Sequence, residues 1–193
     1  MNHLVITCHP RTSSFTRAIA DTVEAVSVAL GHDTRSRDLY ALDFEAVLRA
    51  TDLDALATGS VPPDIRLEQE FLQWTDMLTL VYPIWWAGMP ALLKGYIDRV
   101  LCPDFVFERI GDSPLGPLAG KKVLIFNTTG APSTFYASQD MHQCMASITD
   151  TGIFEICGME VLHHAFFGGV TTIPDNELKT YLANVEAITS RYL

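Results

Sequence analysis

The sequence predicts a single α/β domain over residues 1–193, built on a doubly wound, five-stranded parallel sheet with helices on both faces. Short apolar runs alternate along the chain with longer amphipathic stretches, which is typical of parallel strands joined by crossover helices. The 193 residues are 48% hydrophobic and 19% charged, which suits one sizeable core. No repeat or linker divides them, so we expect one domain.

The N-terminal half supplies the first three strands. Residues 4–8, LVITC, form a continuous apolar run of the kind that is buried on both faces of a sheet. Apolar residues then recur at helical spacing over 15–30, and Gly31 follows as a stop. The polar run 33–40 predicts a strand near the sheet edge. Residues 41–63 predict a long surface excursion, 64–74 a helix and 77–83 the next buried strand.

The C-terminal half continues the alternation. Residues 88–101 give the clearest helix, because apolar side chains recur three and four positions apart and Pro90 falls in the first turn. Residues 121–127 predict a buried strand, and a helix follows from about 140 to 157. Residues 159–169 predict the last strand and 174–193 the last amphipathic helix.

Charge and cysteine content exclude several classes of function. The formal net charge of −10 argues against nucleic acid and anionic membranes as main partners, because both require a positive field. The four cysteines are scattered and lack zinc-ligand spacing, so we expect reduced thiols and no metal site. The first residues do not form a signal peptide, and no apolar run reaches the ~20 residues of a membrane span. We therefore expect a cytoplasmic protein.

Ligands of doubly wound sheets bind at the carboxyl ends of the strands, so the loops 9–16, 83–90 and 128–142 matter most. The first loop, HPRTSSFT, places His9, Arg11 and several hydroxyls at a helix start, where free N–H groups favour a phosphate. Ser13 or Ser14 could instead simply cap that helix. No G-x-G-x-x-G is present, and GPLAGKK (116–122) has the wrong spacing for a P-loop.

The other two loops add an aromatic wall and proton-transfer groups. Adjacent Trp85 and Trp86 cannot both point into the core, so at least one should face a planar ligand or a partner subunit. The third loop offers approachable backbone at 128–131, followed by Tyr136 and His142. A phenol and an imidazole can stabilise a developing charge and move a proton, although either side chain could be structural.

Taken together, these residues resemble the flavodoxin-like NAD(P)H:quinone oxidoreductases, the DT-diaphorase family. The resemblance runs nearly end to end. Its most specific block is 83–101, within DIRLEQEFLQWTDMLTLVYPIWWAGMPALLKGYIDRVL (64–101). It also includes HPRTSSFT (9–16), RDLYALDF (37–44), TTGAPSTFY (128–136) and GIFEICGMEVL (152–162). Ala131 replaces the family's usual Gly, Thr16 stands where many members have Asn, and the C-terminal extension of larger members is missing.

The resemblance implies a non-covalent flavin, FAD or FMN, in each subunit of a homodimer. By position, the residues that would hold the flavin phosphate are His9, Ser14, Phe15 and Thr16. Those that would line the isoalloxazine ring are Pro83, Ile84, Trp85 and Trp86, and those that would contact its pyrimidine edge are Thr128, Thr129, Gly130 and Ala131. Tyr136 and His142 match the catalytic pair that stabilises the reduced flavin.

The activity that the resemblance implies is two-electron, ping-pong reduction of quinones by NAD(P)H. Alternatives that use the same residues are azo- or nitro-compound reduction and a flavin-bound ancillary subunit of a membrane transporter. A serine hydrolase built on Ser14 and His142 lacks a G-x-S-x-G elbow. Arg11, Arg66 and Lys94 are each able to recognise the 2′-phosphate of NADPH. We expect His163 and His164 to lie one in the core and one at the surface.

Overall fold

The computed structural model describes residues 1–107, 116–138 and 140–193, and these form a five-stranded parallel sheet. The strand order is β2-β1-β3-β4-β5, and every neighbouring pair is parallel. The strands are β1 (Asn2–Thr7), β2 (Asp33–Asp38), β3 (Met77–Pro83), β4 (Lys122–Thr128) and β5 (Glu160–Phe167). The predicted fold class is confirmed, including the position of the polar strand β2 at the sheet edge.

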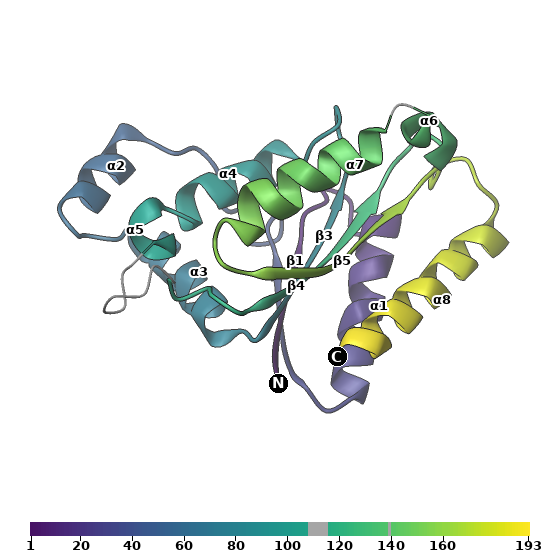
Figure 1. Cartoon of the computed structure of the whole chain (residues 1–193), viewed down its shortest axis with the longest axis horizontal. Helices are drawn as coiled ribbons and strands as arrows, with labels where there is room; N and C mark the ends of the chain where they lie inside the picture. Colours follow the sequence, from purple (N-terminus) through teal and green to yellow (C-terminus); the bar gives the residue numbers. More distant parts are fainter. Residues whose placement is uncertain (108–115, 139) are drawn as a thin grey trace.

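Helices cover both faces of this sheet, as Figure 1 shows. One face carries α1 (Phe15–Ala29) and α8 (Asp175–Tyr192), which pack against each other. The other face carries α3 (Pro63–Trp74), α4 (Ala91–Val100), α5 (Pro103–Val106), α7 (Met141–Ala146) and the π-helix η1 (Ser147–Glu155). Two further helices, α2 (Ala50–Ala57) and α6 (Ser133–Ala137), lie in connections.

Alternating side chains of the central strands divide the core into two layers. On β1, Leu4 and Ile6 face the α3–α4 side, while Val5 faces α1 and α8. All seven residues of β3 are buried, because this strand has neighbours on both edges and helices on both faces. This is the arrangement that the continuous apolar runs predict. Among the described residues, no helix is both long and apolar enough to cross a membrane.

Several element boundaries differ from the prediction. The excursion 41–63 contains α2, whose sequence ATDLDALA has no continuous apolar stripe. Helix α4 begins at Ala91, because Pro90 adopts an extended conformation (φ −55°, ψ 147°) at the position before the helix. The expected helix 140–157 is a short α-helix that continues as the π-helix η1. The expected loop 128–142 includes α6, and its residue 139 lies outside the described residues.

Buried Arg99 of α4 holds the excursion 41–63 against the rest of the fold. Its guanidinium lies 3.0 Å from the Asp52 carboxylate on α2 and 2.6 Å from the Asp64 carboxylate on α3, and it donates to the backbone carbonyl of Glu45. The hydrogen bond from Arg99 lowers the pKa of Asp52. This network explains how a helix without a strong apolar face keeps a defined place.

Buried His3 of β1 lies in a second polar network. Its Nδ1 is 2.8 Å from the Ser27 hydroxyl on α1, and its Nε2 is 2.8 Å from the Thr79 hydroxyl on β3. Burial lowers the pKa of His3 to about 4, with nearby His32 adding to the effect. The folded protein therefore keeps His3 neutral at pH values where the unfolded chain binds a proton.

The lowered pKa of His3 predicts how the stability of the protein changes with pH. The contribution of His3 is fully present above about pH 6.5, the ordinary pKa of the unfolded side chain, and is lost as pH falls toward 4. From pH 7 to pH 5, we expect the free energy of urea unfolding to fall by about 2 kcal/mol more in the wild type than in His3→Gln. Equal losses in the two proteins would contradict the assignment.

Candidate functional site

The strand register brings the three predicted loops together at one edge of the sheet. Thr7 of β1 pairs with Val81 of β3, and Pro83 of β3 pairs with Thr128 of β4, so the three strands end side by side. A cavity of about 370 Å³ lies between the loops that follow. It is lined by His9, Arg11, Ser13, Ser14, Phe15, Thr16, Pro83, Ile84, Trp85, Thr128, Thr129, Gly130, Val170 and Thr171.

The start of α1 forms one wall of the cavity. Ser14 is the N-cap, and its hydroxyl oxygen accepts from the backbone N–H of Arg17 at 3.1 Å. The first-turn N–H groups of Phe15 and Thr16 have no earlier helical carbonyl to bond, so they are available to an anion. The Thr16 hydroxyl lies 2.8 Å from that of Thr128, which ties this wall to the end of β4. Capping and anion binding are thus compatible here.

The cavity has its own positive charge within a negative protein. Arg11 lines the cavity, whereas Arg17 in the same segment faces the carboxylates of Asp21, Glu24 and Asp38. His9 is hydrogen-bonded to the backbone of Arg11, and burial lowers its pKa. Arg11 is therefore the residue that can offset the charge of an anionic ligand here.

The loop after β3 presents its two tryptophans differently. Trp85 and Gly88 exchange backbone hydrogen bonds of 2.9 and 3.1 Å around a tight turn whose central residues, Trp86 and Ala87, have φ of 52° and 59°. Two consecutive left-handed residues other than glycine are strained, which is a common feature of functional sites. The turn aims Trp86 into solvent, so Trp85 lines the cavity beside His9 while Trp86 lies outside it, fully exposed.

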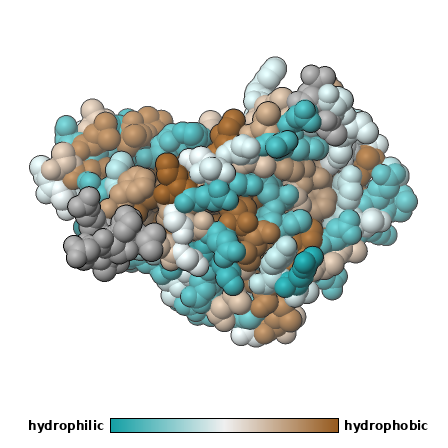
Figure 2. Space-filling view, viewed as in Figure 1, coloured by the Kyte–Doolittle hydropathy of each residue, from teal (hydrophilic) through white to brown (hydrophobic). Residues whose placement is uncertain are grey.

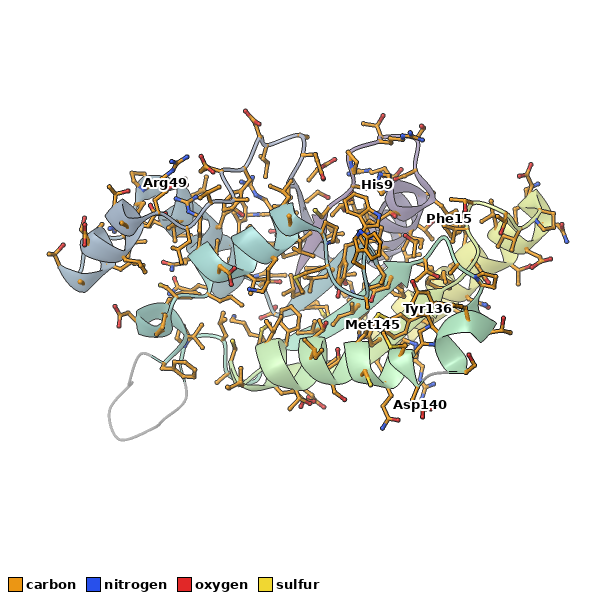
Figure 3. All side chains as sticks on the ribbon, turned by 90° about the horizontal axis from the view of Figure 1, so that it is seen from above. His9, Phe15, Arg49, Tyr136, Asp140 and Met145 are labelled. Carbon is orange, nitrogen blue, oxygen red and sulfur yellow. The ribbon has the colours of Figure 1, made fainter. Side chains whose placement is uncertain are left out.

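The loop after β4 places its small residues and its proton-transfer candidates in different positions. Thr129 and Gly130 line the cavity, and Ala131 lies just beyond it. Tyr136 of α6 and His142 of α7 pack together with ring centroids 5.6 Å apart. Figure 3, which looks onto the carboxyl edge of the sheet, shows Tyr136 at the same end as His9 and Phe15.

The pKa of His142 is lower than that of a free histidine. Burial lowers its pKa, and nearby His164 lowers it further. Its Nε2 atom is buried and makes no hydrogen bond with the described residues. A buried imidazole nitrogen without a described partner is uncommon, so this atom is a candidate to bond a ligand group or a water molecule.

The segment after β5 is a part of the site that sequence reasoning missed. Val170 and Thr171 line the cavity because their segment pairs with the β4 loop. The N–H of Val170 donates to the Thr129 carbonyl at 3.1 Å, and that of Gly169 donates to the Ala131 carbonyl at 2.9 Å. The Gly168-Gly169 pair directly after β5 was the available signal.

Other predicted positions lie elsewhere in the structure. Of the three residues considered for the NADPH 2′-phosphate, Arg11 is at the cavity, whereas Arg66 is on α3 and Lys94 pairs with Asp98 on α4. The expectation for the histidine pair is half right, because the side chain of His164 is buried, whereas His163 is partly buried instead of lying at the surface. Within the ranges that the structure describes, no cluster of three or more His, Cys, Asp or Glu residues could hold a metal ion.

A larger hollow of about 610 Å³ lies between α4, α5 and η1. Its lining is mostly apolar and includes Phe107, Ile148 and Ile156, each more than half exposed. Figure 2 shows hydrophobic residues interrupting a mostly hydrophilic surface on the face that η1 occupies. This hollow is not at the carboxyl ends of the strands and lacks a helix start, so we assign the ligand site to the smaller cavity.

Gly168 allows the segment after β5 to approach α6 closely. A Cβ at this position would lie 2.3 Å from the Ser133 hydroxyl oxygen and 2.4 Å from its backbone nitrogen. We expect Gly168→Ala to lower the free energy of urea unfolding by about 1–3 kcal/mol, because the backbone must shift to relieve the overlap. Gly152→Ala is the control, since the nearest atom would be 3.8 Å away. Equal stability of the two variants would contradict this close contact.

Comparison with known proteins agrees with this architecture. A family described as having a flavodoxin-like fold matches residues 1–189. A relative from Haemophilus influenzae, named an uncharacterized NAD(P)H oxidoreductase, is 36% identical and covers 94% of this chain and 91% of its own. NAD(P)H dehydrogenase (quinone) 1 of Rattus norvegicus is 29% identical over 82% of this chain, and the match spans 65% of the rat protein.

Solved structures support the same fold. An NAD(P)H:quinone oxidoreductase from Methanothermobacter marburgensis superposes with a TM-score of 0.86 at 22% identity, covering 98% of this chain and 94% of its own. General stress protein 14 of Treponema denticola, in complex with FMN, gives 0.71 at 19% identity and covers 99% of each chain. With a family match from residue 1 to 189 and a full-length relative at 36% identity, the chain belongs to the flavodoxin-like fold family.

Proposed function

We propose that the protein is a flavin-dependent NAD(P)H:quinone oxidoreductase. The observation that carries the proposal is that one cavity combines a capped helix start, an aromatic wall and a polar loop edge. The helix start would bind an anion, and the aromatic wall would contact a planar ring system. The polar loop edge would contact a ring edge rich in hydrogen-bonding groups. The names of the Haemophilus and rat relatives, which are NAD(P)H enzymes, support the same chemistry.

The residues present fit a flavin. The first-turn N–H groups of α1, the Ser14 hydroxyl and Arg11 would hold its phosphate, with His9 beside them. Ile84 and Trp85 would contact the ring system, and Thr129 and Gly130 would meet its polar edge. Trp86 stands outside the cavity, so we assign it to the mouth, where it can cover a substrate that arrives after the flavin.

A bound flavin supplies hydride transfer between NAD(P)H and a quinone. The chain contributes orientation and electrostatics. We assign to Tyr136 and His142 the role of donating hydrogen bonds where negative charge develops, because the two rings pack together after β4 and the Nε2 of His142 has no hydrogen-bond partner among the described residues. We further propose that NAD(P)H and the quinone bind in turn at the mouth of this cavity, which is ping-pong order.

The first experiment is the visible spectrum of the purified protein, followed by chromatography of any released chromophore. We expect oxidised-flavin bands that NADH or NADPH bleaches and a quinone restores, and the chromatography distinguishes FMN from FAD. A colourless protein that binds neither flavin would overturn the proposal. A flavin that NAD(P)H and quinone do not turn over would instead favour the ancillary role on a transporter.

We also propose that two copies associate through the apolar hollow between α4, α5 and η1. The exposed side chains of Phe107, Ile148 and Ile156 gather there, and a contiguous apolar patch of this kind is typical of a protein interface. We expect Ile156→Asp to shift the sedimentation coefficient from dimer to monomer. Leu53→Asp, which changes an equally exposed apolar residue on α2, is the control. A wild-type monomer at micromolar concentration would contradict this assembly.

A further inference from the structure

His164 joins three elements behind the candidate site. It lies on β5, and its side chain is 5% exposed. Its Nδ1 is 2.7 Å from the Asp150 carboxylate on η1, and its Nε2 is 2.6 Å from the Asn127 side-chain oxygen on β4. A buried histidine with a carboxylate on one nitrogen and an amide on the other is fixed in orientation.

Both partners of the ring are oxygen acceptors. The orientation of the Asn127 amide follows from its NH₂ group, which donates to the Tyr82 carbonyl at 3.4 Å and leaves the amide oxygen toward His164. The carboxylate of Asp150 is also an acceptor. Satisfying both contacts requires an N–H on each ring nitrogen, which is the hydrogen-bonding pattern of an imidazolium. The adjacent carboxylate offsets its charge.

Phe166 connects His164 to His142 by stacking. The His164 and Phe166 rings have centroids 4.3 Å apart with an angle of 19° between their planes. The Phe166 and His142 rings are 4.5 Å apart at 28°, and Tyr136 follows at 5.6 Å from His142. The four rings form a continuous column from the Asp150 contact on η1 to Tyr136 on α6.

His142 depends on this column for its position. Its Nε2 makes no hydrogen bond with the described residues, and its ring packs against those of Phe166 and Tyr136. The titratable groups around it are Tyr136 on α6, His164 on β5 and, behind His164, Asp150 on η1. Burial lowers the pKa of His142, and nearby His164 lowers it further.

We propose that His164, held as an imidazolium by Asp150 and Asn127, is a positioning residue that sets the orientation and charge of His142 through Phe166. The effect on catalysis rests on the role proposed above for His142. The hydrogen-bonding state of His164 does not rest on that role and is measurable by itself. A second positive charge on His142 is disfavoured while His164 carries one.

The direct test is ¹⁵N NMR of the histidine rings in the whole protein at pH 7. His164 is assigned by the loss of its signals in His164→Gln. We expect protons on both ring nitrogens of His164 in the wild type, and loss of one of them in Asp150→Asn. A wild-type His164 with one unprotonated nitrogen would overturn the proposal, whatever the enzymatic activity.

The kinetic test uses the same variants with NAD(P)H and a soluble quinone. We expect His164→Gln and Asp150→Asn to lower kcat about tenfold with little change in KM, because His142 is misplaced while the substrate surface is intact. The acid limb of the pH profile should move to higher pH in both variants, since each removes the positive charge that lowers the pKa of His142.

His163→Gln is the matched control. His163 precedes His164 on β5, but its ring stacks on Tyr192 of α8, on the opposite face of the sheet. We expect wild-type kcat and pH profile for this variant. Wild-type kinetics in both His164→Gln and Asp150→Asn would overturn the positioning role. A wild type without reductase activity would instead reject the proposed function, and the NMR result would still decide the state of His164.

Discussion

The parallel pairing of β1, β3 and β4 is the constraint on which the rest of the molecule depends. After β1 the chain enters α1 on one face of the sheet, and after β3 it enters α4 on the other. The two connections therefore diverge and leave a crevice at the carboxyl edge. The fixed register then places the ends of β3 and β4 next to each other, as the bond from the Ile84 N–H to the Thr128 carbonyl shows.

The buried polar groups share one structural role. Each lies where two or three elements meet, and each has partners that belong to different elements: Arg99 joins α2, α3 and α4, and His3 joins α1, β1 and β3. Such contacts specify one relative placement of the elements, since any shift would leave a buried polar group without a partner. His164 belongs to the same class, and it is the member whose stacked rings lead to His142 and Tyr136.

The site combines a rigid base with a strained rim. The helix start and the strand ends are fixed by backbone pairing and by the Thr16–Thr128 contact. The turn at Trp86 and Ala87 is held in a left-handed conformation instead, and its tryptophan is fully exposed. Strain and exposure of this kind cost stability, so the turn is best understood as a surface prepared for a ligand that covers it.

The sequence by itself determined the fold class, the five strands and the three loops that form the site, because apolar periodicity is set locally by which faces are buried. It also offered Ser13 or Ser14 as the helix cap, and the structure shows that Ser14 is the one. The tertiary structure alone decided the rest. Helix α2 depends on an arginine 47 residues away, Val170 reaches the cavity by pairing with the β4 loop, and His164 finds its partners on β4 and η1. These contacts join residues that are distant in the chain. They form only when the elements pack together, so a local sequence pattern does not predict them.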